Sequence, residues 1–288
     1  LNRELMKILG FDFSRGRADE SAHPFSTGDR GDQRITTRYR ESEFLEALLA
    51  TAHEVGHASY EDGLPQQWEG LPIGEARNLC IHESQSLFFE KQIFLSRPFF
   101  EYFMPQVTQI FGLPTAYSGE AIWQAATRVS PSLIRVEADE VTYPLHIILR
   151  YQIEEKLING NMDAEEIPEA WDQGMRNLLG LSTTGDYRNG CMQDMHWSDG
   201  TFGYFPSYTM GALNSAQLSQ AIRTAIPDLT DQLRRGEVDS LRTYLRDKVW
   251  QKGSTCSSGD IMISATGRTT EPGPFLTHLR QRYLEDLY

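Results

Sequence analysis

The chain has 288 residues, and its 27 Lys and Arg against 40 Asp and Glu give a net charge of −13. An anionic chain does not suit a nucleic-acid backbone or an acidic membrane surface as its main partner, so we expect neither. A hydrophobic fraction of 40% and a charged fraction of 23% are those of an ordinary globular protein, which excludes disorder as the main state.

The first part of the chain is predicted to combine a little β structure with a long amphipathic helix. Residues 1–9 have a helical pattern, whereas residues 11–40 are rich in Gly, Arg, Asp and Ser and indicate a loop. Within that loop, the β-branched residues of 34–39 favour a short strand. From residue 41 onward, apolar residues recur every three or four positions, which predicts a helix with Ser42 as a candidate N-cap.

The remainder of the chain is predicted to be mostly helical. After a loop over residues 62–74, a second long helix is expected to begin near Glu75. The periodicity predicts further helices at residues 99–111, 119–129, 141–157, 164–179, 210–226, 228–235, 239–251 and 274–287. Residues 182–203 and 253–259 indicate long functional or connecting loops. Because no repeat or domain break is visible, residues 1–288 are predicted to form a single all-α domain.

The cysteines indicate a reducing compartment, and the lack of a long apolar run or a signal-peptide pattern favours a cytoplasmic protein. The cysteines are Cys80, Cys191 and Cys256, an odd number without C-x-x-C spacing, which argues against a disulfide framework or a four-thiolate zinc site. No apolar run approaches the ~18 residues that span a bilayer, and the first residues lack the pattern of a signal peptide. We therefore expect a cytoplasmic protein.

A candidate metal-binding motif lies within the first long predicted helix. The segment His53-Glu54-Val55-Gly56-His57 spaces two histidines by four residues, so both imidazoles lie on one helix face and can hold one ion. Glu54 is then the natural general base of a metal-assisted hydrolysis, in which zinc lowers the pKa of bound water towards ~7. Amide hydrolysis is the leading reaction. The alternative is a pair of exposed histidines with an incidental glutamate.

A catalytic zinc site needs a third protein ligand, which leaves a fourth position for water. A metzincin site would need His at position 63, where this chain has Gly63. The nearby carboxylates are those of Glu61, Glu69, Glu75, Glu83 and Glu90. We choose Glu83 because it lies in a polar cluster within an otherwise apolar helix, where a polar group needs a partner. Glu61 shares the helix of His57 and cannot readily close the tetrahedron. An ordinary buried carboxylate is the alternative for Glu83.

Five further segments, in order and together with the metal motif, resemble the thermostable Taq-type metallocarboxypeptidases. They are His23-Pro24-Phe25, Asp32-Gln33-Arg34-Ile35-Thr36, His82-Glu83-Ser84-Gln85, Ile134-Arg135-Val136-Glu137-Ala138-Asp139 and Gly203-Tyr204-Phe205-Pro206-Ser207-Tyr208. The resemblance covers nearly the whole chain. Members of this family are considerably longer, so we expect the chain to correspond to their C-terminal part and to lack a helical N-terminal part.

The resemblance implies a large all-helical body around a substrate groove. With the predicted strand, this gives a fold with a small β element near the metal site. It also implies one zinc ion per subunit, with cobalt as a substitute, and removal of single residues from peptide C-termini with broad specificity. A homodimer is implied as well, with peptides that carry a free C-terminus as substrates.

The resemblance assigns His53, His57 and Glu83 to the metal and Glu54 to the general base, in agreement with the choice from the residues alone. It further implies that Arg135, assisted by Arg34, holds the terminal carboxylate of the substrate. A guanidinium group suits that role because it binds a carboxylate through two parallel hydrogen bonds. From the residues alone, an i, i+4 pair of Arg135 with Asp139 is the stronger interpretation.

Two kinds of aromatic side chain complete the implied site. Tyr208, with Tyr204 as the second choice, is expected to support the oxyanion of the tetrahedral intermediate, and His23 to line the pocket for the leaving residue. The alternatives are aromatic packing for the tyrosines and anchoring of a loop for His23. Pro144 departs from the family's usual Asn, and a proline there must begin a helix rather than lie within it.

Two other functions stay open at this point. A related zinc oligopeptidase would cut internal bonds of short peptides. A catalytically silent fragment would bind metal or peptide without turnover. A purely structural zinc site is disfavoured, because such sites use four protein ligands, usually with thiolates.

Overall fold

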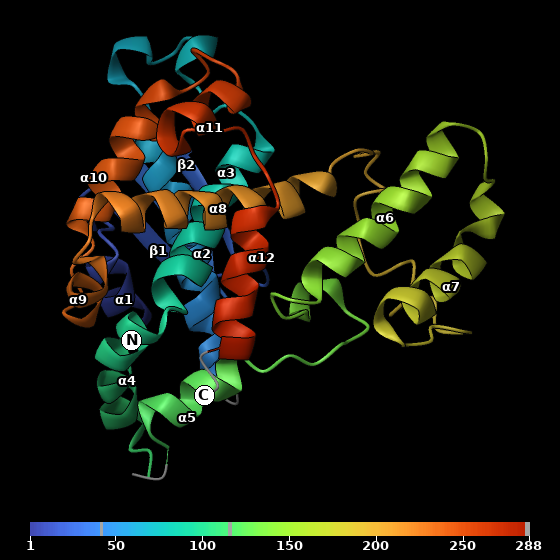
Figure 1. Ribbon diagram of the computed structural model, residues 1–288, viewed down its shortest axis with the longest axis horizontal. Coiled ribbons are helices and arrows are strands. Elements are labelled where there is room, and N and C mark those ends of the chain that lie inside the picture. The colour runs from blue at the N-terminus through green and yellow to red at the C-terminus, as the bar shows by residue number, and fades with distance from the viewer. Residues whose placement is uncertain (41–42, 115–116, 286–288) are drawn as a thin grey trace. The chain divides into compact units, whose positions relative to one another are not determined.

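The computed structural model describes residues 1–40, 43–114 and 117–285 (Figure 1). These residues contain twelve α-helices and one three-stranded sheet, so the mostly helical fold is confirmed. The chain divides into two compact units. Unit 1 comprises Leu1–Ala126 and Gly211–His278, and unit 2 comprises Thr127–Met210 and the chain from Leu279 onward. The single-domain organisation and the substrate groove stay predictions.

Unit 1 is a helical body built around an aromatic core. Its helices are α1 (Asn2–Ile8), α2 (Phe44–Asp62), α3 (Leu79–Leu87), α4 (Arg97–Phe111), α5 (Gly119–Ala126), α9 (Leu229–Arg234), α10 (Asp239–Lys248) and α11 (Ser258–Thr266), with most of α8 (Pro206–Ala225) and the first part of α12 (Gly273–Arg280). The core contains Phe94, Phe99 and Phe103, which are fully buried and whose ring centroids lie 5.9–6.3 Å apart. Such aromatic contacts supply much of the buried apolar area.

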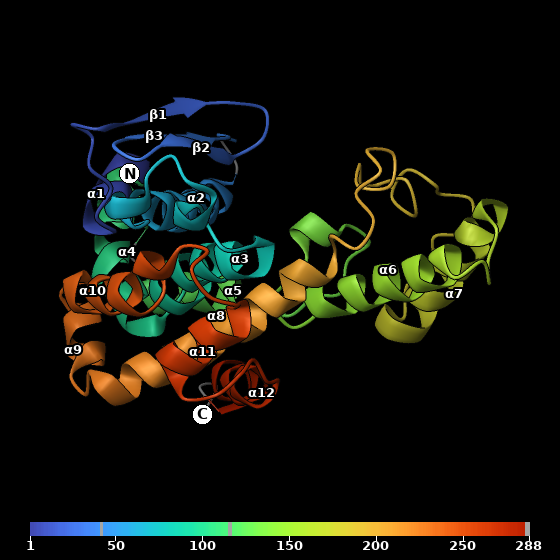
Figure 2. The same cartoon turned by 90° about the horizontal axis from the view of Figure 1, so that it is seen from above.

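A small sheet covers one side of α2 (Figure 2). Its order is β1-β3-β2: β1 (Gly16–Glu20) runs parallel to β3 (Asp32–Thr37), and β2 (Phe25–Asp29) runs antiparallel to β3. The strand expected near residues 34–39 corresponds to β3, which buries Ile35. The interpretation as loop was wrong for residues 16–20 and 25–29, which form β1 and β2. These strands are short, polar and largely exposed, so they lack the alternation that marks a strand in the sequence.

The helix boundaries around the metal motif differ slightly from the prediction. α2 begins at Phe44, and the candidate N-cap Ser42 lies outside the described residues. α3 begins at Leu79 rather than near Glu75, because the side chain of Asn78 accepts a hydrogen bond from the backbone N–H of Ile81 and so caps the helix there. The chain then continues from α3 as a π-helical stretch, Phe88–Phe94.

Unit 2 packs α6 (Tyr143–Ile158) against α7 (Ile167–Leu179) around the buried side chains of Leu149, Trp171 and Met175. Pro144 stands in the first turn of α6, which agrees with the expectation that it begins a helix. The loop predicted over residues 182–203 has no helix or strand, as expected.

The predicted C-terminal helix at residues 274–287 is shorter than expected. α12 ends at Arg280 and is followed by a π-helical stretch, Gln281–Glu285, whereas residues 286–287 lie outside the described part. In unit 2, the buried Glu140 carboxylate accepts hydrogen bonds from Arg282 at 2.9 Å and Tyr283 at 3.0 Å.

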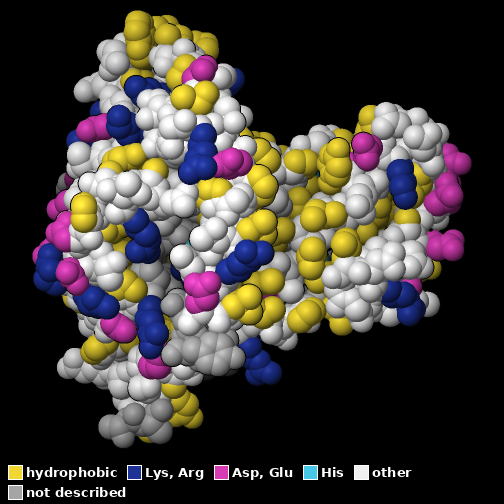
Figure 3. Space-filling model, in the orientation of Figure 1, with side chains coloured by type: hydrophobic (Ala, Val, Ile, Leu, Met, Phe, Trp, Pro, Cys, Tyr) yellow, Lys and Arg dark blue, Asp and Glu magenta, His cyan; other side chains and the backbone are white. Residues whose placement is uncertain are grey.

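The surface carries charges of both signs. Figure 3 shows basic and acidic side chains interspersed over α9 and α10, where ion pairs join Arg234 to Asp231 and Arg235 to Glu237. Among the helices that the structure describes, none combines the length and the apolar character that a membrane crossing requires.

Candidate metal centre

The two motif histidines lie on the face of α2 that packs against α3. His53 and His57 are one turn apart, and Gly56 between them lets the α3 backbone approach closely. A Cβ atom at Gly56 would lie 2.5 Å from the carbonyl oxygen of Gln85 and 2.6 Å from the Cα of Ser86. The sequence thus brings α2 near enough to α3 for side chains of both helices to share one site.

Three donor atoms converge between these helices. The Oε2 of Glu83 lies 3.7 Å from the Nε2 of His53 and 3.5 Å from the Nε2 of His57. One ligand atom from each of the three residues lies within 4.8 Å of the other two. Ligands of a tetrahedral zinc ion with bonds of about 2.1 Å would lie about 3.4 Å apart. Two imidazoles and one carboxylate at these separations therefore fit a catalytic metal site that leaves a fourth position open. Gly211 of α8 packs directly on Glu83, since a Cβ there would lie 2.7 Å from its Cγ.

The pKa values of the ionisable groups around these donor atoms are strongly shifted. Burial raises the pKa of Glu54 to about 7. Burial alone would lower the pKa of His53, but the carboxylates of Glu83 and Glu90 outweigh it and raise the pKa to about 9. Burial, together with the neighbouring His53, lowers the pKa of His57 well below its usual value. Such opposed shifts within one cluster are typical of functional sites.

The outer ring nitrogens of both histidines are also held. The Nδ1 of His53 lies 2.9 Å from the Oε2 of Glu90. The Nδ1 of His57 lies 2.6 Å from the Nδ1 of His82, and the Nε2 of His82 lies 2.7 Å from the Oε1 of Glu61. Sequence reasoning did not identify these second contacts of the histidines.

Of the five carboxylates considered from the sequence, the structure places only Glu83 among the three donors. Glu90 contacts His53, whereas Glu61 contacts His82, which in turn contacts His57. Glu69 and Glu75 are exposed in the segment before α3. Because Glu83 and Glu90 are seven residues apart, both face α2, and the spacing alone does not distinguish their roles.

Close packing at Gly56 leads to a first prediction. We expect Gly56→Ala to destabilise unit 1 by about 1–3 kcal/mol, because the added methyl group meets backbone atoms that no side-chain rotation can move away. The methyl group should also push α2 away from α3, which would move the histidines away from Glu83 and weaken metal binding. Urea unfolding and metal titration measure the two effects. The matched control is Gly273→Ala, since a Cβ at Gly273 meets nothing within 4 Å. Equal stability of the two variants would contradict this packing argument.

Two predicted substrate-binding residues lie in the small sheet of unit 1. Arg34 is on β3 with its side chain 58% exposed, and it forms an ion pair with Asp32 at 2.8 Å. His23 lies exposed in the turn between β1 and β2, where its backbone carbonyl accepts hydrogen bonds from the hydroxyls of Ser21 and Thr36. Contacts of the backbone, rather than of the imidazole, hold this turn.

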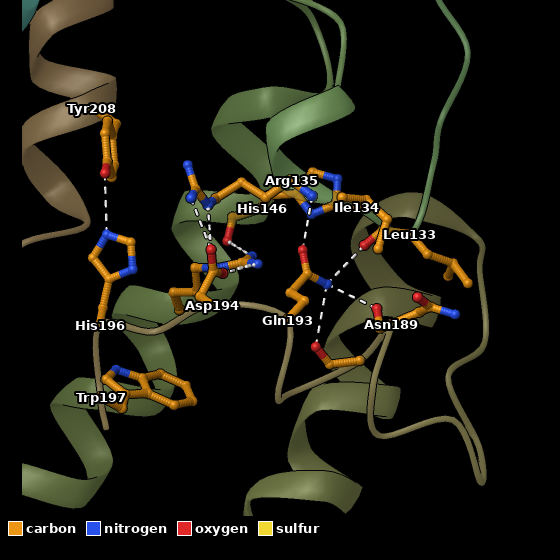
Figure 4. Close-up of polar contacts among 12 residues, drawn as sticks. Leu133, Ile134, Arg135, His146, Asn189, Gln193, Asp194, His196, Trp197 and Tyr208 are labelled. Atoms are coloured by element: carbon orange, nitrogen blue, oxygen red, sulfur yellow. Dashed lines mark hydrogen bonds and ion pairs between the residues drawn. The ribbon is translucent and has the colours of Figure 1, made fainter. Parts of the chain in front are cut away.

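Arg135, the residue expected to bind a carboxylate, lies in unit 2 within a buried ionic cluster (Figure 4). Its Nε and Nη2 donate to Asp194 Oδ1 at 3.0 and 2.8 Å, and its Nη1 donates to the Tyr143 hydroxyl at 2.6 Å. The other carboxylate oxygen accepts from Arg150 Nε at 2.6 Å. Three of the five N–H groups of the Arg135 guanidinium are therefore engaged, and two buried guanidinium groups share one carboxylate.

The alternative pairing of Arg135 with Asp139 was wrong. Residues Arg135–Glu137 form a 3₁₀ turn rather than an α-helix, so the i, i+4 geometry does not arise. Asp139 instead accepts hydrogen bonds from the backbone N–H groups of Val141 and Thr142, just before α6.

The predicted tyrosines also lie in unit 2, beside the same cluster. The Tyr208 hydroxyl is 3.1 Å from the Nε2 of His196, and the Arg135 guanidinium lies 4.9 Å from the centre of the Tyr208 ring. The rings of Tyr204 and Tyr208 are 5.4 Å apart. Figure 4 shows Tyr208 and His196 pointing towards each other. Tyr208 therefore has both an aromatic packing role and a polar partner.

Burial has the largest effect on the pKa values of this cluster, and the neighbouring charges come second. Burial lowers the pKa of Arg150 to about 10. Burial alone would raise the pKa of Asp194, but hydrogen bonds and charges of the two arginines outweigh it and hold the pKa below its usual value. Burial and then Arg150 lower the pKa of His146 to about 4, and within the described chain its ring nitrogens have no hydrogen-bond partner. Sequence reasoning missed both Arg150 and Asp194.

Comparisons with known proteins identify the family of the chain. A sequence model of the family described as Carboxypeptidase Taq (M32) metallopeptidase matches residues 1–283. Thermostable carboxypeptidase 1 of Thermus thermophilus is 41% identical over 281 residues, which are 97% of this chain and 55% of that protein. Carboxypeptidase 1 of Bacillus subtilis is 38% identical over 98% of this chain and 57% of that protein.

Solved structures give the same result. Trypanosoma cruzi metallocarboxypeptidase 1 matches with a TM-score of 0.96 and 43% identity, over 98% of this chain and 59% of that chain. The M32 carboxypeptidase from Deinococcus radiodurans R1 matches with a TM-score of 0.95 and 36% identity, over 99% of this chain and 57% of that chain. The fold is thus that of a metallopeptidase family. The chain belongs to the Carboxypeptidase Taq (M32) family, and it spans just over half the length of the curated relatives it matches.

Proposed function

We propose that this chain carries the metal site of a zinc-dependent carboxypeptidase that removes single residues from peptide C-termini with broad specificity. The observation that carries the proposal is the convergence of His53, His57 and Glu83, with the buried Glu54 next to His53. Membership of a metallopeptidase family and the carboxypeptidase names of its relatives support the same reaction. Cobalt is expected to substitute for zinc at this donor set.

Each residue near the metal has a separate task. His53, His57 and Glu83 would hold the ion, which when bound acidifies a water molecule and polarises the scissile carbonyl. Glu54 accepts a proton from the attacking water and returns it to the nitrogen of the leaving residue. Its position on the helix that holds two of the ligands gives it a fixed place beside the reaction.

Other residues would select the substrate and stabilise charge. Arg135 would hold the terminal carboxylate through N–H groups that Asp194 and Tyr143 do not use, with Arg34 assisting. Tyr208, with Tyr204 as the alternative, would donate a hydrogen bond to the oxyanion that develops during attack. His23 would line the pocket of the leaving residue.

The test of the proposed function is a digest of one peptide in two forms, the free acid and the C-terminal amide, with zinc or cobalt added. Mass spectrometry should show that, in the presence of metal, the free acid alone loses one C-terminal residue at a time and gives a ladder of shortened peptides. A chelator should abolish it. Internal cuts in both forms would instead identify an oligopeptidase. Metal binding without cleavage would identify a catalytically silent chain.

Arg135 gives a prediction about this selectivity. Arg135→Lys keeps the charge next to Asp194 but loses the planar fork, so kcat/KM for the free acid should fall about tenfold or more. Any slow cleavage of the amide should change little. The control is Arg176→Lys, the same substitution at an exposed arginine of unit 2 that pairs with Asp172. An equal decrease for both peptide forms would argue against carboxylate recognition by Arg135.

The location and assembly of the protein are part of the proposal. The three free cysteines and the negative net charge support a cytoplasmic protein that has no nucleic-acid or membrane partner. A homodimer is also proposed, on the family resemblance. Light scattering at several concentrations tests it, and a mass of one subunit throughout would refute it.

A further inference from the structure

A line of three polar side chains leads away from the metal centre. His57 and Glu61 lie one turn apart on the same face of α2. His82 comes from α3, immediately before the donor Glu83. The Nδ1 atoms of His57 and His82 are 2.6 Å apart, and the Nε2 of His82 is 2.7 Å from a carboxylate oxygen of Glu61. All three side chains are partly buried, with 18%, 24% and 33% of their surfaces exposed in the order His57, His82, Glu61.

The protons on this line are fixed by the chemistry of the imidazoles. The Nε2 of His57 faces the donor set, 3.5 Å from Glu83, so a bound metal ion would take its lone pair and leave the hydrogen on Nδ1. That N–H donates to the Nδ1 of His82, which must accept. The hydrogen of His82 then lies on Nε2 and donates to Glu61, which only accepts. Only one direction of donation satisfies every atom.

The other metal histidine is held without an intermediate. The Nδ1–H of His53 donates directly to the Glu90 carboxylate at 2.9 Å. Both metal histidines are thus linked to a carboxylate: His53 directly to Glu90, and His57 through His82 to Glu61. In other metalloproteins, such outer contacts fix the orientation and tautomer of a ligand histidine and make it a better donor.

We propose that Glu61 and His82 form a relay that positions His57 for metal binding. The relay holds the ring plane of His57, keeps its hydrogen on Nδ1 and transmits the negative charge of Glu61 to the ligand through His82. Both are positioning residues, because they touch neither the substrate nor the metal. The inference rests on the proposed metal site, and its test measures metal affinity rather than activity.

The test compares zinc dissociation constants of four variants of this chain, obtained by competition with a chelating dye. Cobalt absorption spectra report the ligand geometry in the same samples. His82→Phe keeps approximate volume but removes both nitrogens, and we expect zinc affinity to fall about 10–100-fold. His82→Asn keeps an oxygen near the Nδ1 position, so it should recover part of that loss. Glu61→Gln should lose less than His82→Phe, and the exposed Glu75→Gln serves as its matched control.

The order of the two His82 variants separates the relay from a packing role. A packing role predicts that the smaller asparagine harms the site more than phenylalanine, whereas the relay predicts the reverse. Circular dichroism identifies a variant that fails to fold. If His82→Phe fails to fold, the comparison of Glu61→Gln with Glu75→Gln decides. Equal zinc affinity of those two would overturn the relay while leaving the metal site intact. No zinc binding by the parent chain would overturn the proposed metal site and the relay together.

Discussion

Replacement of Glu54 by glutamine is expected to reduce peptide turnover about 10²–10⁴-fold, the range attributed to a positioned proton acceptor. Glutamine has the same shape but cannot accept the proton of the attacking water. The donor atoms come from His53, His57 and Glu83, so the variant should still bind one metal ion. Initial rates on a free-acid peptide and metal content by atomic spectrometry measure the two properties on one preparation.

The control for this substitution is Glu75→Gln, which makes the same chemical change at an exposed position before α3. It should leave both rate and metal content unchanged. If Glu54→Gln retains activity within a few-fold of the parent chain, another group accepts the proton. If the variant loses its metal, its low turnover would not identify Glu54 as a base. The expectation that Glu54 is not needed for metal binding would then be wrong.

The convergence of His53, His57 and Glu83 could be predicted in part from local spacing. A four-residue interval places His53 and His57 on one face, and the polar surroundings of Glu83 single it out within an apolar helix. The second contacts could not be chosen in this way. Whether Glu83 or Glu90 joins the two histidines depends on how α3 and the π-helical stretch after it pack against α2, and Gly56 allows the close approach of α3.

Polar contacts between residues far apart in the chain could not be predicted from the sequence either. Helical periodicity predicted most helices, because each buries one apolar stripe. The partner of Arg135 is 59 positions away at Asp194, in a loop without periodicity. Local spacing pointed to Asp139 instead, and that interpretation failed because residues 135–137 are not α-helical. The polar strands β1 and β2 were missed because their stability comes from backbone pairing with β3.

The shared carboxylate of Asp194 should make unit 2 depend strongly on this single residue. Asp194→Ala would leave the guanidinium groups of Arg135 and Arg150 buried without their common counter-charge, and removing one partner of a buried pair costs about 3–5 kcal/mol. Asp194→Asn keeps the volume but removes the charge, so it should also destabilise the unit. The control is Asp231→Asn, whose ion pair with Arg234 is exposed and should contribute little.

The pH dependence of unfolding distinguishes the charge of Asp194 from its packing. Its pKa in the folded protein is lowered, so the folded state binds this proton less readily than the unfolded chain does. The stabilisation is therefore complete above the unfolded value of about 3.9 and disappears as the pH falls through the folded pKa. Urea midpoints of the parent chain and Asp194→Asn should differ most near neutral pH and converge in acid. A constant difference across this range would show that Asp194 stabilises unit 2 through shape and hydrogen bonding rather than through its charge.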